Sequence, residues 1–317
     1  MRTIVVVRML SLCASLCALA ACNSRALPSL GPDESAETPA FDRHGSWMGS
    51  GSAGKDLLYV SDVRTREVKI YSYPSGAPQG MLAGFSEPWG LCVDRAGNVF
   101  VTDLTAMRIF EFAHGATKPS AILKDPGEQP GGCAVDPTTG NLAVANVSTP
   151  YSGGGDLAIY RHARGKPRMH KDRSILYYEF CGYDSLGNLY VDGVKGGAVA
   201  LAELPHGHTS LTNIALDQSI RFAGAVQWDG SALALGDYES NAIYRFKITG
   251  SRGTKIGETH LKGASFPIGF WIAGSTVIAA NNDGHSVMYW KYPAGGPHTK
   301  AIVGLDSPLN AAVSLRK

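Results

Sequence analysis

The chain has 317 residues, of which 44% are hydrophobic and 18% are charged, and its formal net charge is +2. Arg2 and Arg8 are the only charged residues before Cys22, so without this segment the net charge is 2 − 2 = 0. A neutral chain with scattered Lys and Arg lacks the basic surface that nucleic-acid-binding proteins need. We therefore expect no nucleic acid among its partners.

The N-terminal segment has the features of an export signal. After a basic start, residues 9–21 are uncharged, and this run is shorter than the roughly 20 apolar residues that a helix needs to cross a bilayer. The run ends in Leu19-Ala20-Ala21-Cys22, which resembles the lipobox of bacterial lipoproteins. This resemblance implies that the signal is removed before Cys22 and that Cys22 is acylated, for example with palmitate. An ordinary signal peptide that happens to contain Cys22 is the alternative.

Three segments are expected along the chain. Residues 1–21 form the lipoprotein signal peptide, residues 22–54 form a flexible tether rich in Ser, Gly, Pro and Ala, and residues 55–317 form the folded domain. Asn23 follows the cysteine, and by resemblance to the sorting rule of enteric bacteria this favours the outer membrane. The expected location is thus the bacterial cell envelope, where the lipid would hold the protein on a membrane.

Six segments of the remaining chain share one pattern of an apolar strand, a tight turn, a second strand ending in Asp, Asn or Gly, and an aromatic-rich third strand. The second strands are expected at 58–62, 99–103, 142–146, 189–193, 233–237 and 277–281. Their last residues are spaced by 41, 43, 47, 44 and 44 residues. Four-stranded units repeated at this period predict a β-propeller.

The first strand of each unit is the innermost, and it is rich in small residues because the innermost strands converge on the axis. Residues 88–94, 130–136, 180–184 and 222–229 show this composition, whereas residues 267–274 are bulkier. The final segment, 307–314, resembles an innermost strand without outer strands after it. The sequence therefore predicts an all-β, six-bladed propeller of four-stranded antiparallel blades, with the ring closed by the C-terminal strand.

One segment carries a resemblance to a known family. Residues 88–103, Pro-Trp-Gly-Leu-Cys-Val-Asp-Arg-Ala-Gly-Asn-Val-Phe-Val-Thr-Asp, resemble an NHL repeat, and later units are degenerate versions of it. The resemblance covers residues 56–317 and implies the propeller fold. It does not select a function, because NHL-like propellers include substrate-reading domains of ligases, lyases, sugar-lactone hydrolases and binding modules.

Ligands of propellers usually bind on the face where the innermost strands begin, and oxygen-bearing residues are expected there. The loops before the innermost strands supply Glu87, Glu128, Glu179 and Asp306, and the second strands supply Asp62, Asp103, Asn146, Asp192, Asp237 and Asn281. Such oxygens could hold a divalent cation such as Ca²⁺, or a polyol. For the second-strand set we favour a structural role, because short polar side chains can bond turn amides.

The Gly-rich loop 146–156 lies on the same expected face. Tyr151 at its tip could cover a ligand, and a mobile insertion without a function is the alternative.

An enzyme alternative comes from a resemblance to gluconolactonase-like propellers. Their metal set would correspond to Glu87, Asn146, Asp237 and Asn281, but their Glu-Gly-Pro motif is matched only in part by Ser86-Glu87-Pro88-Trp89. We therefore expect a monomeric binding or scaffolding module for an unknown protein or small molecule. A metal-dependent hydrolase with its site at the channel mouth is the second hypothesis, and a purely structural interaction module is the third.

Three cysteines are expected in innermost strands. Cys133 and Cys181 stand three residues before their unit's Asp, whereas Cys92 is one residue out of step. We interpret all three as small apolar residues that fit near the axis. The alternative in an exported chain is one disulfide and one remaining thiol.

Overall fold

The computed structural model describes residues 45–125, 128–149 and 153–317. The signal peptide, Cys22, the tether up to residue 44 and Tyr151 lie outside these residues. The described part is all-β, with 26 strands and two short 3₁₀ helices, η1 (Ser52–Gly54) and η2 (Arg161–Ala163). None of its helices has the length and apolar character needed to cross a membrane.

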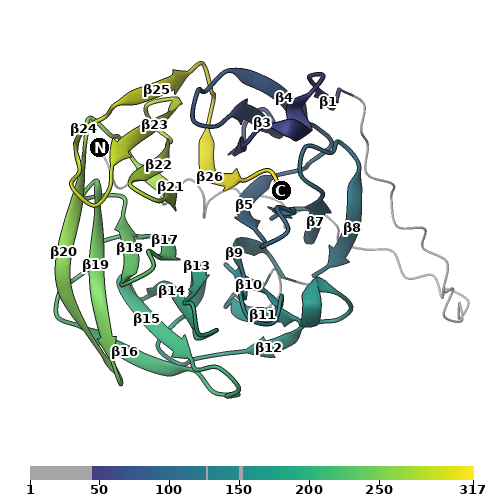
Figure 1. Ribbon diagram of the computed structural model, residues 1–317. Coiled ribbons are helices and arrows are strands. Elements are labelled where there is room, and N and C mark those ends of the chain that lie inside the picture. Colours follow the sequence, from purple (N-terminus) through teal and green to yellow (C-terminus); the bar gives the residue numbers. More distant parts are fainter. Residues whose placement is uncertain (1–44, 126–127, 150–152) are drawn as a thin grey trace, which may run out of the picture. The chain divides into compact units, whose positions relative to one another are not determined.

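The strands form sheets that are arranged around a central axis, which is the arrangement of a β-propeller (Figure 1). The sheet that contains the first strands has the order β1 (Trp47–Met48), β4 (Pro78–Leu82), β3 (Glu67–Ser72), β2 (Leu57–Asp62) and β26 (Pro308–Ser314). The next two sheets are β5 (Pro88–Val93), β6 (Val99–Asp103), β7 (Arg108–Phe112) and β8 (Pro119–Lys124), and β9 (Pro130–Val135), β10 (Leu142–Asn146), β11 (Asp156–Tyr160) and β12 (Arg168–His170).

The following sheet has nine strands and consists of two antiparallel runs. The first run is β13 (Tyr177–Tyr183), β14 (Leu189–Lys195), β15 (Ala198–Leu204) and β16 (Thr212–Leu216). The second is β17 (Ala223–Trp228), β18 (Leu233–Asp237), β19 (Ala242–Thr249) and β20 (Arg252–Lys262), and a short parallel pairing of β16 with β20 joins the runs. Here β24 (Gly296–Pro297) also pairs with β20. The remaining sheet is β21 (Pro267–Ala273), β22 (Thr276–Asn281), β23 (Ser286–Lys291) and β25 (Lys300–Val303).

The two ends of the propeller sequence meet in one sheet. The C-terminal strand β26 pairs with β2 from Leu57 opposite Ser314 to Asp62 opposite Pro308. Every residue of both strands is buried. Residues 47–54, which the sequence analysis assigned to the tether, differ from that expectation, because β1 pairs with β4 and Ser52 is buried against Gln79.

The innermost strands approach one another as closely as their small residues suggest. A Cβ atom added to Gly90 would lie 2.3 Å from the carbonyl oxygen of Gly131, and one added to Gly182 would lie 2.5 Å from that of Val226. Both contacts cross to the innermost strand of a neighbouring sheet or run, so a side chain at either position would push the strands apart.

Large side chains nevertheless pack between the innermost strands. The rings of Trp89 and Phe180 are nearly parallel, with their centroids 5.7 Å apart, although they come from the non-adjacent strands β5 and β13. Both belong to a buried cluster with Phe270 and Leu309 from two further innermost strands. The rings of Trp89 and Phe180 therefore fill space that the small residues of the innermost strands leave.

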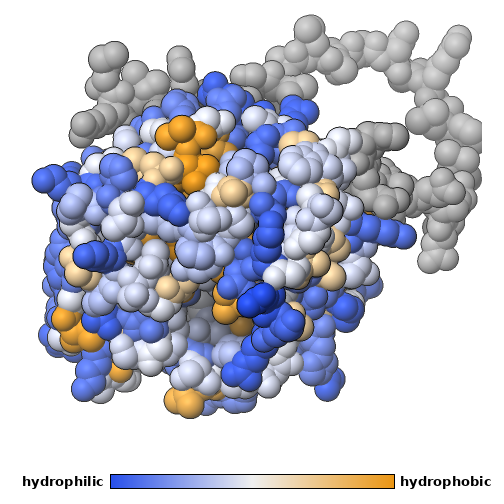
Figure 2. Space-filling model, turned by 45° about the horizontal axis from the view of Figure 1, so that its top comes forward, coloured by the Kyte–Doolittle hydropathy of each residue, from blue (hydrophilic) through white to orange (hydrophobic). Residues whose placement is uncertain are grey.

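On the outside, the face of the molecule shown in Figure 2 is mostly hydrophilic, and its hydrophobic residues form small separate areas.

Candidate functional site

The polar residues that end the second strands cap the loops before the innermost strands. Asp103 accepts hydrogen bonds from the backbone amides of Ser86 at 2.7 Å and Glu87 at 2.8 Å. The same pattern recurs at Asp62 with Asp306 and Ser307, at Asp237 with Arg221 and Phe222, and at Asn281 with Ser265. Asp192 differs, because it lies within β14 and accepts from the backbone amide of Phe180 inside β13. These contacts agree with the structural role favoured from the sequence.

Asn146 departs from this pattern. Its side-chain Nδ2 donates to Asp156 Oδ1 at 2.8 Å, and its Oδ1 is buried without a hydrogen-bond partner among the described residues. The loop before its innermost strand is held instead by backbone bonds between Gln129 and residues 147 and 148. The acceptor that the other sheets use for a loop amide is therefore free in this sheet.

The four loop carboxylates have different surroundings. Glu87 accepts a hydrogen bond from the Thr105 hydroxyl, and Asp306 pairs with Arg64 at 3.5 Å while 42% of its side chain remains exposed. Burial raises the pKa of Glu179 to about 7. Glu128 also has its pKa raised to about 7, first by burial and then by the negative charges of Asp156 and Asp125. Tyr151 lies outside the described residues.

The metal set implied by the gluconolactonase resemblance is dispersed over four sheets or runs. Glu87 precedes β5, Asn146 ends β10, Asp237 ends β18 and Asn281 ends β22. In the part of the chain that the structure describes, no group of three or more His, Cys, Asp or Glu side chains stands ready to hold a metal ion. The oxygens of Asp237 and Asn281 accept bonds from backbone amides, as described above, which favours a structural use for both.

The mouth of the channel on this face is more apolar than the sequence analysis expected. Partly buried residues, namely Val63, Leu104, Val147 and Ile268, pack against the Trp89–Phe180 cluster. Beside them, the ring of Tyr238 lies 5.2 Å from those of both Phe222 and Phe266, and all three rings are partly exposed. We missed this aromatic row because its members precede or follow the strands and lie outside the strand repeat.

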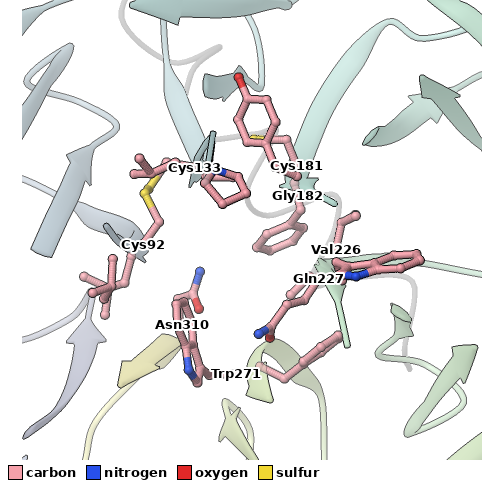
Figure 3. A pocket seen from close by; sticks show the side chains of 18 residues that line it. Cys92, Cys133, Cys181, Gly182, Val226, Gln227, Trp271 and Asn310 are labelled. Atoms are coloured by element: carbon pink, nitrogen blue, oxygen red, sulfur yellow. A yellow bond between two sulfur atoms is a disulfide. The ribbon is translucent and has the colours of Figure 1, made fainter. Parts of the chain in front are cut away.

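A pocket lies on the opposite face, where the innermost strands end (Figure 3). This pocket has a volume of about 200 Å³ and is lined by Cys92, Cys133, Gly182, Gln227, Trp271 and Asn310, among others. The Gln227 amide donates to the carbonyl of Ile272 at 3.1 Å and accepts from its N–H at 2.7 Å, so its polar atoms are already engaged. The pocket is smaller than the roughly 300–1,000 Å³ typical of small-molecule sites.

Two of the cysteines on the wall of this pocket form a disulfide (Figure 3). Cys92 in β5 and Cys133 in β9 have Cα atoms 5.6 Å apart and are bonded, whereas Cys181 is a buried free thiol. Our interpretation of all three as merely small apolar residues was therefore wrong for this pair. Successive side chains of a strand point to opposite faces, so the one-residue offset of Cys92 turns it towards Cys133. Cys133 and Cys181 share a phase and point the same way.

Comparisons with known proteins agree with this architecture. Residues 85–112 match the family model of the NHL repeat. The crystal structure of a nidogen/laminin complex contains a chain with a TM-score of 0.69 and 13% sequence identity, over 83% of this chain and 99% of that one. The chain is a β-propeller that contains a match to the NHL repeat.

Two further proteins resemble this propeller, one in its fold and one over a short segment of its sequence. A protein of unknown function from Bacteroides caccae aligns with a TM-score of 0.61 and 10% identity, over 83% of this chain and 100% of that one. Peptidyl-glycine alpha-amidating monooxygenase A from Xenopus laevis is 39% identical over 71 residues, which are 20% of this chain and 8% of that enzyme. The chain thus matches only a small part of the enzyme, and the structural likenesses concern the fold alone.

Proposed function

We propose that this chain is an exported, lipid-anchored propeller that binds a partner protein on the face where the innermost strands begin. The aromatic row of Phe222, Tyr238 and Phe266 carries the proposal, because it presents partly exposed rings next to an apolar channel mouth. Aromatic side chains are enriched at protein interfaces and often dominate their binding energy. The similar nidogen/laminin structure is a complex of proteins, which supports the same use of the fold.

The number of blades and the closure of the ring are also part of the proposal. Counting each of the two runs in the nine-stranded sheet as a blade gives six blades, and the pairing of β26 with β2 would close the ring. A closed ring leaves no unpaired innermost edge and makes a rigid support for the aromatic row. The signal at 1–21, the lipidated Cys22 with its tether, the outer-membrane location and the monomeric state complete the proposal.

A double substitution, Tyr238→Ser with Phe266→Ser, tests the binding face. We expect the full chain to retain one polypeptide in stoichiometric amount from detergent-solubilised envelopes, and the double variant to retain it at least roughly tenfold less, because aromatic anchors commonly contribute 2 kcal/mol or more. Leu186→Ser is the matched control, since Leu186 is 71% exposed in the turn after β13, away from this face. Melting temperatures of all three proteins check that they are folded.

Equal retention by the double variant would contradict the proposal. Hydrolysis of a sugar lactone by the unmodified chain, lost on Glu87→Gln, would favour the gluconolactonase-like alternative instead.

A further inference from the structure

Four oxygen-bearing side chains gather between the β5–β8 and β9–β12 blades. Asp125 follows β8, Glu128 lies in the next loop, and Asn146 and Asp156 face each other at the end of the β10–β11 pairing. Asp125, Asn146 and Asp156 are at most 2% exposed. The group thus combines three carboxylates with one amide, and most of it is shielded from solvent.

Several acceptor atoms of this group have no donor. Within the described residues, both carboxylate oxygens of Asp125, Oε2 of Glu128 and Oδ1 of Asn146 are buried without a hydrogen-bond partner. A buried acceptor without a donor is costly, commonly by about 1–3 kcal/mol and more for a charged group. Buried groups of this kind are rare in native proteins and call for an explanation, such as a bound ion.

Among the described residues, the negative charges of this group also lack a sufficient partner. Asp156 adds a second negative charge beside Asp125, and Tyr160 and Asn146 are the neighbouring donors. Both donors are engaged elsewhere, because the Tyr160 hydroxyl donates to the carbonyl of Lys124 at 3.2 Å and Asn146 Nδ2 donates to Asp156. Lys171 Nζ lies 3.7 Å from Asp156 Oδ2, but 59% of its side chain is exposed, so it compensates the cluster weakly. His170 also acts on Asp156, and one of its ring nitrogens is already bonded to the carbonyl of Thr209 at 2.9 Å. One exposed ammonium therefore faces three carboxylates.

We propose that Asp125, Glu128, Asn146 and Asp156 form a Ca²⁺ site between these two blades. The ligand set contains only oxygen, which suits a hard cation, and Ca²⁺ takes six to eight oxygens in a flexible geometry. Four side-chain oxygens have no hydrogen-bond partner among the described residues, two from Asp125 and one each from Glu128 and Asn146. Asp156 Oδ2 would be the fifth, in place of its 3.7 Å contact with Lys171, because Oδ1 accepts the Asn146 amide. Backbone carbonyls and water would complete the shell.

The departure of Asn146 from the capping pattern is the independent observation behind this assignment. Its Nδ2 donates to Asp156, and its Oδ1 is buried without a hydrogen-bond partner among the described residues. Because no three acidic groups stand ready to hold a metal in the described residues, the side chains would have to move inwards to bind the ion. Ca²⁺ tolerates an irregular arrangement of ligands, whereas Mg²⁺ requires near-octahedral geometry.

Calcium titration of the full chain after treatment with a chelator tests the site. We expect one Ca²⁺ per chain by calorimetry, a melting temperature that rises with Ca²⁺ more than with Mg²⁺, and an affinity that falls by roughly tenfold or more in Asp125→Asn and in Glu128→Gln, since each removes a charged ligand. Asp306→Asn is the matched control, because Asp306 occupies the equivalent loop of another blade and pairs with Arg64. Its Ca²⁺ affinity should equal that of the unmodified chain.

The metal-free melting temperature guards against a variant that merely fails to fold. Removing a charge from a group of repelling carboxylates should leave the metal-free protein at least as stable, so a lower melting temperature with unchanged calcium binding would overturn the site. Absence of calcium binding at millimolar concentration would overturn it too. Tighter binding of Zn²⁺ than of Ca²⁺ would overturn the choice of cation.

Discussion

At the scale of single residues, the polar group that ends a second strand has one recurring use and one exception. Asp62, Asp103, Asp237 and Asn281 all accept bonds from the loop that leads into their own innermost strand. The sequence allowed this use to be predicted, because the residues recur with the repeat. The exception at Asn146 depends on its bond to Asp156 at the start of β11, and an Asp at the start of the third strand does not recur in the other described sheets.

Glu179 gives a prediction about pH. Burial raises the pKa of its carboxyl group from 4.5 to about 7, and the neighbouring Asp192 and Tyr238 are acidic groups that interact with it. The folded state thus prefers the neutral form, so the stability contribution is complete below about pH 4.5 and is lost as the pH rises through about 7.

Glu179→Gln should therefore reduce the fall in melting temperature between pH 5 and pH 8, because Gln resembles the neutral acid. Thermal unfolding of both proteins across this range measures the effect, and at pH 5 the two should melt at similar temperatures. If the melting temperatures of the two proteins fall equally between pH 5 and pH 8, the burial of Glu179 is not the cause of the pH dependence.

At the scale of elements, the strands could be predicted because their period and turn residues are local features of the sequence. The expected second strands at 99–103, 142–146 and 233–237 coincide with β6, β10 and β18. The start of the domain was less predictable, because β1 has only two residues and is defined by its pairing with β4 rather than by its composition. In the sequence, the only sign of the disulfide was that Cys92 stands one residue out of step with Cys133 and Cys181. This offset can be interpreted only when the positions of the neighbouring blades are known.

The C-terminal strand offers a test of ring closure. Deleting residues 305–317 removes β26, leaves the inner edge of β2 unpaired and removes the buried side chains of Leu309 and Val313. We expect a loss on the order of 5 kcal/mol or more, which approaches the whole stability of a typical domain. Chemical unfolding measures it, and deletion of the exposed Arg316 and Lys317 alone is the control. Equal stability of the longer deletion would mean that the ring closes in another way.

At the scale of the whole molecule, the sequence predicted the propeller but left its ligand open. An all-β repeat fixes the architecture because each unit needs neighbours to bury its faces. Polar residues were expected at the channel mouth, and the aromatic row was missed, since side chains from several blades create that surface together. Trp89 could be expected in the core from its place in an innermost strand, but its stacking on Phe180 could not. The similar proteins support the fold and do not add a residue to the site.

The anchor can be tested on the intact chain. Cys22→Ser should release the protein from the membrane fraction and abolish labelling by a fatty-acid analogue, because lipidation at this cysteine is the proposed attachment. Cys17→Ser, which changes a cysteine within the same apolar run, is the control and should retain both properties. Membrane retention and labelling that survive in Cys22→Ser would contradict the lipoprotein interpretation.

The Cys92–Cys133 disulfide links two adjacent innermost strands that are 41 residues apart in sequence. Disulfides form readily outside the cytosol and are rare within it, so in a chain exported as proposed this cross-link between the β5–β8 and β9–β12 blades would form only after export. Until then the innermost strands of the two blades would be held together by non-covalent contacts, next to the carboxylates at their boundary. The chain would therefore be easiest to keep unfolded before export, and its last covalent step would take place where the mature protein works.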